Sequence, residues 1–87
     1  MSGIMRAPDP GDATRSMSIP YSGTLADNDM LVLTFSAGIP EIGAYYESGA
    51  WKTTSYVREL VDSNNVLTFI ANGSDFEKAA FIPGPNH

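Results

Sequence analysis

The sequence predicts an all-β protein that folds as a small antiparallel sandwich or a small barrel. Apolar residues recur mainly at every second position, which is the period of a strand with one buried face. Turn-forming residues separate these stretches at intervals of about eight to twelve residues. Strands do not alternate with long helical patterns, so a parallel sheet is not expected. Of the two architectures we expect the β-sandwich, formed as a single domain over residues 14–83.

The first predicted strand covers residues 17–21 and follows a flexible lead-in over residues 1–13 that is rich in Pro, Gly and Asp. Because Pro20 cannot donate a hydrogen bond to a neighbouring strand, we expect this strand to lie at a sheet edge or to end there. The clearest strand is residues 30–36. Both of its faces are largely apolar, so we expect it to be central in its sheet and covered on both sides.

A hairpin is predicted from strands at residues 42–47 and 51–57 that are joined by a turn at residues 48–50. The returning strand is rich in β-branched and aromatic residues, which strands favour. A cluster of turn-forming residues at 62–65 then precedes a short apolar strand at residues 66–71.

One short helical turn is predicted near residues 75–80. Ser74 can cap the start of a helix, and Glu77 follows it at the spacing of a capping box. Residues 84–87 contain Pro and Gly and are expected to form a loose tail.

Composition and charge exclude several classes of function. Ten acidic and five basic side chains give a net charge of −5, which argues against a nucleic-acid binder because such proteins need a basic surface. The absence of cysteine excludes disulfide scaffolds, thiolate zinc sites and cysteine nucleophiles. The longest apolar run, residues 30–35, is too short to span a bilayer, so no membrane insertion is expected.

The sequence shows no set of catalytic residues. His87 is the sole histidine and the last residue, where nothing is expected to fix its geometry, so we interpret it as a solvated end. The closest carboxylate pairs, Asp27 with Asp29 and Asp75 with Glu77, lie where turns and helix caps favour acidic residues. We therefore expect a protein that is not an enzyme and that uses no cofactor.

Calcium is the metal that the acidic turns suggest. Residues 27–29 and 62–65 offer carboxylate and amide oxygens, which are the ligands that calcium favours. Neither stretch has the spacing of an EF-hand loop, and hairpin turns use the same residue types. No metal site is therefore assigned.

The candidate partner-binding residues are four aromatic residues and a nearby cation: Tyr45, Tyr46, Trp51, Tyr56 and Arg58. Alternate residues of a strand face opposite ways, so at least one of the two adjacent tyrosines should face solvent near a basic residue. Tyr, Trp and Arg are enriched at binding hot spots. The alternative is structural, with Trp51 in the core and the tyrosines covering its rim. Flat aromatic faces also suit carbohydrate, but nothing in the sequence specifies a saccharide.

Residues 18–35 contain a strand that ends in Pro-Tyr, a glycine, an acidic turn residue and alternating apolar residues: Pro20, Tyr21, Gly23, Asp29, Leu31, Leu33 and Phe35. This pattern resembles the immunoglobulin-like repeats of bacterial surface adhesins of the invasin and intimin kind. Residues 67–79 resemble the strand and short helical turn that follow in those repeats. The chain departs from the pattern at Asn28, where glycine is usual, and at Phe35, where tryptophan is common. The family also continues with further strands beyond the position of Pro83.

The resemblance implies an immunoglobulin-like sandwich with a structural or adhesive role and no catalysis. It also implies that Asp29 anchors its loop and that the alternating aliphatic residues after it form one inner face of the sandwich.

Two functions stay open at this point. The first is an immunoglobulin-like spacer or adhesive domain of a bacterial surface protein, in which an open sheet edge would pair with a strand of a protein partner or cause self-association. The second is a small stand-alone acidic protein, such as one encoded by a phage, that binds and inhibits or decorates a macromolecular partner. The first implies a cell-surface or secreted location. The second implies a cytoplasmic one, because the N-terminus carries no secretory signal.

Overall fold

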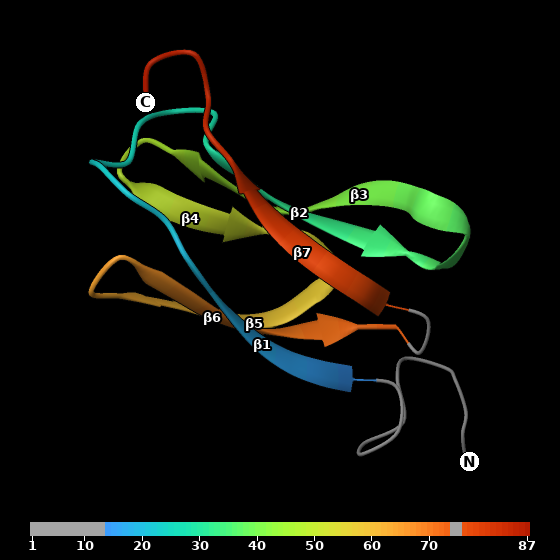
Figure 1. Ribbon diagram of the computed structural model, residues 1–87. Coiled ribbons are helices and arrows are strands. Elements are labelled where there is room, and N and C mark those ends of the chain that lie inside the picture. Colours follow the sequence, from blue (N-terminus) through green and yellow to red (C-terminus); the bar gives the residue numbers. More distant parts are fainter. Residues whose placement is uncertain (1–13, 74–75) are drawn as a thin grey trace.

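The computed structural model describes residues 14–73 and 76–87 and shows two antiparallel sheets packed face to face (Figure 1). The three-stranded sheet has the order β1–β6–β5, with bounds Thr14–Pro20, Val66–Asn72 and Val57–Ser63. The four-stranded sheet has the order β4–β3–β2–β7, with bounds Ala50–Thr53, Ile39–Glu47, Met30–Phe35 and Phe76–Ile82. A 3-10 turn, η1 (Ser36–Gly38), links β2 to β3. The prediction of a small all-β antiparallel sandwich is confirmed.

The chain crosses from one sheet to the other after β1, after β4 and after β6. The first and last crossings are interlocked, because β1 pairs with β6 in the three-stranded sheet and β2 pairs with β7 in the four-stranded sheet. Segments that lie far apart in the sequence are therefore neighbours in both layers, as Figure 1 shows for β1, β6 and β7.

The core lies between the sheets and is built from alternate residues of the central strands. Leu31 and Leu33 of β2 are fully buried, and so is Leu67 of β6. The remaining buried apolar side chains come from both layers and are Phe35, Ala44, Val57, Phe69, Ala71 and Phe76. This is the pattern that strand periodicity requires when two sheets share one core.

The predicted helical turn near residues 75–80 is wrong. Residues Phe76–Ile82 form β7, which pairs antiparallel with β2 from Phe76 opposite Phe35 to Ile82 opposite Met30. The expected cap, Ser74, lies outside the described residues. Pairing with β2 and burial of Phe76 outweigh the local capping signal, as tertiary contacts commonly do. Within the described residues, no helix is long and apolar enough to cross a membrane.

The predicted return strand at residues 51–57 is two strands in different sheets. β4 ends at Thr53 and β5 begins at Val57, so residues 54–56 carry the chain between the layers. The hydroxyl of Thr54 donates a hydrogen bond to the carbonyl of Ile42 at 2.7 Å and fixes this crossing to β3.

Two tight turns match their predicted positions. Ser48 and Gly49 between β3 and β4 have φ angles of 53° and 80°, and Asn64 and Asn65 between β5 and β6 have φ angles of 54° and 59°. Positive φ at both central residues is the requirement of the type I′ turns that suit the twist of hairpins.

The expectations for the first two strands are met except in one respect. β1 lies at the edge of its sheet and ends at Pro20, and β2 is central between β3 and β7, as predicted. However, β2 is covered by the other sheet on one side only. Met30 and Val32 on its opposite side are half-buried by their neighbours within the sheet and face outward.

The segment after β7 is attached to the rest of the fold, although the sequence predicts a loose tail at residues 84–87. The amide of Gly84 donates a hydrogen bond to Asp29, and His87 contacts both Asp29 and Ser22. Figure 1 shows this segment beside the connection between β1 and β2. The lead-in predicted for residues 1–13 lies outside the described residues.

Candidate functional site

The predicted aromatic cluster divides between the two faces of the four-stranded sheet. Tyr45 faces solvent opposite Lys52 of β4 and is 36% exposed. Its neighbour Tyr46 faces inward opposite Trp51, and the two rings meet edge to face with centroids 5.5 Å apart. The prediction that one of the adjacent tyrosines faces solvent near a basic residue is confirmed.

Tyr56 and Arg58 lie away from that hairpin. Tyr56 lies at the opposite end of the sandwich, where its ring packs against Phe35 with centroids 5.4 Å apart. Arg58 is exposed on β5, in the three-stranded sheet. The five candidate residues therefore occupy four places and do not form one surface.

The outward-facing side of the four-stranded sheet carries an apolar surface. It consists of residues that alternate with core residues along β2, β3 and β7: Met30, Val32, Ile42, Tyr45, Ala80 and Ile82. We call this set the apolar outer face. Its exposed fractions are 45% for Ile42, 36% for Tyr45 and 42% for Ile82, so water contacts much of it.

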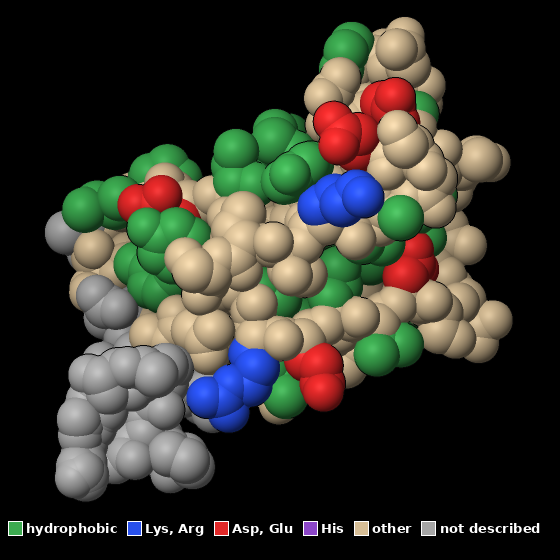
Figure 2. Space-filling model, turned by 180° about the vertical axis from the view of Figure 1, so that it is seen from behind, with side chains coloured by type: hydrophobic (Ala, Val, Ile, Leu, Met, Phe, Trp, Pro, Cys, Tyr) green, Lys and Arg blue, Asp and Glu red, His purple; other side chains and the backbone are tan. Residues whose placement is uncertain are grey.

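Two cations border the apolar outer face. Lys52 lies opposite Tyr45, and Lys78 lies opposite Thr34 on the other side of the sheet. Both lysines are exposed. In the view from behind, hydrophobic side chains gather in several patches and basic side chains stand singly near them (Figure 2).

The outward-facing side of the three-stranded sheet is different. Ser18, Thr68 and Val61 form one row across it, and the hydroxyls of Ser18 and Thr68 are hydrogen-bonded at 2.9 Å. Ser16 and Glu59 flank Ile70 in the next row, and Pro20 and Ser63 flank Val66 in the row at the other side. This surface mixes hydroxyl groups with separate apolar side chains and is therefore more polar than the apolar outer face.

A second cluster lies where the β1–β2 connection meets the segment after β7. The carboxylate of Asp29 is fully buried and accepts hydrogen bonds from the amides of Ala26 at 2.9 Å and Gly84 at 2.6 Å. The expectation that Asp29 anchors its loop is confirmed. The preceding Asn28 has a φ of 74°, a left-handed conformation that Asn tolerates better than most residues.

His87 completes this cluster, so its interpretation as a solvated end is wrong. Its imidazole is 17% exposed, with Nδ1 2.7 Å from Asp29 Oδ2 and Nε2 2.6 Å from the carbonyl oxygen of Ser22. A carboxylate and a carbonyl can only accept hydrogen bonds, so both ring nitrogens carry protons and the ring is an imidazolium. These two hydrogen bonds and the charge of Asp29 raise the pKa of His87.

The same contacts lower the pKa of Asp29. Burial raises the pKa of this carboxyl, but the hydrogen bonds from Ala26, Gly84 and His87 together outweigh burial and hold the pKa below its ordinary value of 3.8. Since His87 Nε2 is engaged with a backbone carbonyl rather than a nucleophile, the arrangement is that of an anchor for residues 84–87.

Asp62 joins two aromatic residues near the same end. Its carboxylate accepts hydrogen bonds from the Tyr21 hydroxyl at 2.9 Å and from the Trp51 indole Nε1 at 3.0 Å. Burial and the hydrogen bond to Asp62 raise the pKa of Tyr21 to about 12. Among the described residues, no group of three or more His, Asp or Glu side chains is placed to hold a metal ion.

Sequence reasoning missed the Asp29–His87 pair and the contrast between the two outer surfaces. The contrast had a signal, because residues 30–35 are apolar on both faces. For the pair, the sequence indicates only that Asp29 lies in a turn. No local pattern links that turn to a residue 58 positions later.

Comparison of the chain with models of protein families, with curated proteins and with solved structures gives no match.

Proposed function

We propose that the protein is a non-enzymatic binding module and that it binds another protein through the apolar outer face. Both functions left open by the sequence, an immunoglobulin-like domain of a bacterial surface protein and a stand-alone acidic binding protein, share this activity. The resemblance of residues 18–35 to adhesin repeats supports the same general role.

The observation that carries the proposal is the unequal character of the two outer surfaces. A sheet surface that only meets water gains nothing from Ile42, Tyr45 and Ile82. On the surface of the three-stranded sheet, apolar residues such as Val61 and Ile70 are instead interspersed with serine and threonine hydroxyl groups. Contiguous exposed apolar surface in a small protein is characteristic of an interaction site. Tyrosine, present in this face as Tyr45, is a residue type that contributes strongly to binding energy.

The charges beside this face favour a particular kind of partner. Lys52 and Lys78 border the apolar residues, so a matching surface would be apolar with carboxylates at its rim. A second copy docked face to face would bring Lys52 and Lys78 toward a surface whose exposed carboxylate beside Tyr45 is, among the described residues, Glu47 alone, so the two lysines would not both be matched. We therefore assign the face to a different protein with an acidic rim rather than to self-association.

The non-enzymatic part of the proposal is supported by the state of the histidine. Both nitrogens of His87 are engaged as donors, which leaves no lone pair for a general base.

Site-specific photocrosslinking in the cells that make the protein tests the proposal. p-Benzoylphenylalanine at position 45 is expected to give one protein adduct of defined mass, while the same group at the exposed Val61 of the other surface gives none. The purified partner should then bind Ile42→Ser and Tyr45→Ser variants at least about tenfold more weakly, and Val61→Ser normally.

Three outcomes would overturn the proposal: no adduct at position 45, the same adduct at both positions, or unchanged affinity of the Ile42→Ser and Tyr45→Ser variants. Sedimentation of the wild type at several concentrations is expected to give a monomer. A dimer that Tyr45→Ser abolishes would assign the face to a second copy instead.

A further inference from the structure

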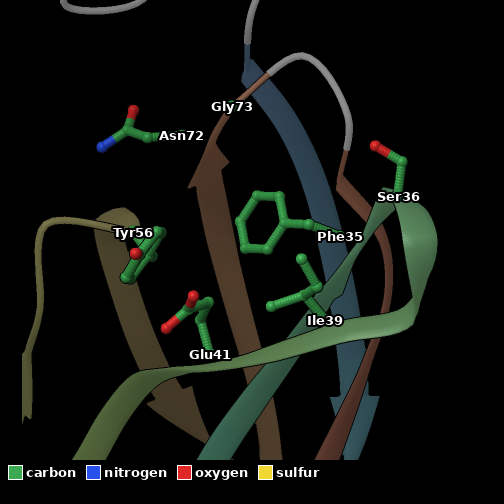
Figure 3. A pocket seen from close by; sticks show the side chains of 7 residues that line it. All are labelled: Phe35, Ser36, Ile39, Glu41, Tyr56, Asn72 and Gly73. Atoms are coloured by element: carbon green, nitrogen blue, oxygen red, sulfur yellow. The ribbon is translucent and has the colours of Figure 1, made fainter.

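A recess opens at the end of the sandwich opposite the Asp29–His87 pair, between β3, β6 and the crossing before β5. Figure 3 shows the Phe35 ring in the middle, with Tyr56 to its left, Ile39 below it and Glu41 to the lower left. The recess has a volume of about 300 Å³. At about 30 Å³ for each water-sized group, this is room for a ligand of roughly ten heavy atoms.

Two aromatic rings in this recess are fixed in place by the fold. Phe35 and Tyr56 meet at an angle of 50°, and Phe35 is supported by Phe76 at a centroid distance of 6.0 Å. The backbone around Tyr56 is held at both ends, since its carbonyl accepts a hydrogen bond from the amide of Asn72 at 2.8 Å and its amide donates to Thr54 Oγ1 at 3.3 Å. The rings therefore form a preorganised aromatic corner.

A carboxylate lies beside these rings. Glu41 is half-buried on β3, and within the described residues it forms no ion pair. Arg15, a cation at this end of the sandwich, is already engaged, because its guanidinium donates to the carbonyl of Phe76 at 2.9 Å and lies 5.6 Å from the centroid of that ring. A cation that enters the recess would therefore meet this carboxylate in the lining.

We propose that this recess binds an organic ammonium group on a short alkyl chain. Glu41 supplies the countercharge, the rings of Phe35 and Tyr56 attract the cation through their electron-rich faces, and Ile39, which is 54% exposed, contacts the alkyl chain. A metal ion is disfavoured because, among the described residues that line the recess, Glu41 is the one carboxylate, and hard cations require several oxygen ligands. This binding site lies apart from the apolar outer face and is independent of the proposed function.

Titrations followed by amide and side-chain NMR shifts of the full chain test the proposal. The probes are n-butylammonium and Nα-acetyl-lysine N-methylamide, with Nα-acetyl-norleucine N-methylamide as the neutral match. Both cations are expected to shift Ile39 and Tyr56 resonances saturably with dissociation constants in the millimolar range, and the neutral compound is not. Tighter binding of the lysine derivative than of butylammonium would identify a lysine side chain as the source of the ammonium group, and the reverse would identify a free amine.

The variants assign the binding to the recess. Glu41→Gln is expected to weaken binding at least about fivefold, and Tyr56→Leu to weaken it further while circular dichroism remains that of the wild type. Glu47→Gln, at the other end of the same strand, is the matched control and should bind normally. Equal binding of the neutral compound, equal affinity of Glu41→Gln, or absence of saturable shifts would overturn the proposal.

Discussion

His87 Nδ1 lies 2.7 Å from Oδ2 of Asp29, the buried charged side chain of the described core. The contact joins the turn before β2 to the segment that follows β7, and these strands are neighbours in the four-stranded sheet. The Phe81 ring also meets the imidazole edge to face at 5.4 Å. One ion pair therefore closes this end of the sandwich, and its protonation state should control how firmly the end is closed.

Asp29→Asn is expected to lower the free energy of unfolding by about 2 kcal/mol or more, because the amide leaves His87 without a countercharge and turns a donor toward groups that also donate. Urea denaturation of the two proteins at pH 6 measures the difference. Asp27→Asn is the control. Asp27 is exposed and accepts one hydrogen bond, from Ser48, so its replacement should change stability by less than about 0.5 kcal/mol. Equal effects of the two substitutions would contradict a special role for the buried carboxylate.

Stability is expected to fall as the pH rises through the pKa of His87. The pKa of this imidazole is raised above its ordinary value of 6.5 in the folded state, so its contribution is complete below pH 6.5 and is lost as the pH passes the raised pKa. The pKa of Asp29 shifts in the opposite direction, so its contribution to stability has the opposite pH dependence. Its pKa is lowered below 3.8, so its contribution is complete above that value and is lost as the pH falls through the lower pKa of the folded state.

The chain contains one histidine, so His87→Gln isolates the first of these effects. Urea midpoints between pH 5 and pH 9 should decline in the wild type relative to the variant, and the difference between the two curves should vanish at high pH. The N-terminal amine titrates in both proteins and cancels in the difference. Parallel curves across this range would show that folding does not raise the pKa of the histidine.

Asp62→Ala is expected to release two aromatic residues at once. Tyr21 loses the acceptor that helps to raise its pKa to about 12, so that pKa should move toward 10.0, and Trp51 loses the acceptor of its indole N–H. Ultraviolet absorbance during alkaline titration follows the tyrosine, with Tyr21→Phe identifying its step, and a red shift of fluorescence emission follows Trp51. Glu59→Ala removes an exposed carboxylate from the same strand and should change neither signal.

Much of the fold follows from strand periodicity and turn chemistry. The apolar alternation of residues 30–35 gives the central strand, and Pro20 correctly marks the end of an edge strand. The turn at Ser48 and Gly49 and the turn at Asn64 and Asn65 lie where the sequence predicts them, because few residue types accept positive φ. These features depend on residues that are close together in the sequence, so the sequence pattern predicts them.

The errors in the predicted fold have non-local causes. Nothing within residues 76–82 indicates that β2 offers a free edge to this segment, so the spacing of Ser74 and Glu77 favoured a helix in the prediction. The division of the predicted return strand at residues 54–56 likewise depends on contacts with another strand, through the bond from Thr54 to Ile42.

The candidate sites likewise include features that local sequence predicts and features that depend on non-local contacts. Alternation alone predicts that Tyr45 faces solvent, and the structure confirms this. Alternation does not show whether the second apolar face of β2 meets another layer or water, because that depends on how many sheets pack together. The recess beside Glu41 likewise requires three segments to meet, which no short pattern encodes.

Gly43 marks the place where β3 bulges against β2, since the register between the two strands shifts between Leu31 and Val32 and leaves one extra residue on β3. The glycine is buried, and a Cβ atom added to it would lie 2.8 Å from Cγ2 of Val57 and 3.0 Å from Cγ of Leu33. Those distances are shorter than carbon atoms tolerate, so the two sheets would have to separate locally. Gly43→Ala should therefore lower the free energy of unfolding by about 1–3 kcal/mol.

A double-mutant cycle distinguishes crowding from a simple loss of backbone freedom. Val57→Ala removes the nearest methyl group, so the combined Gly43→Ala and Val57→Ala variant should be more stable than the sum of the single effects predicts, by about 1 kcal/mol. Combining Gly43→Ala with Val61→Ala, which alters an exposed side chain on the far surface of the other sheet, should give additive effects. Additivity in both pairs would mean that the glycine is not required by the approach of Val57. Coupling confined to the first pair would mean that the absence of a side chain at residue 43 allows β5 to pack against the bulge of β3 at this point in the core.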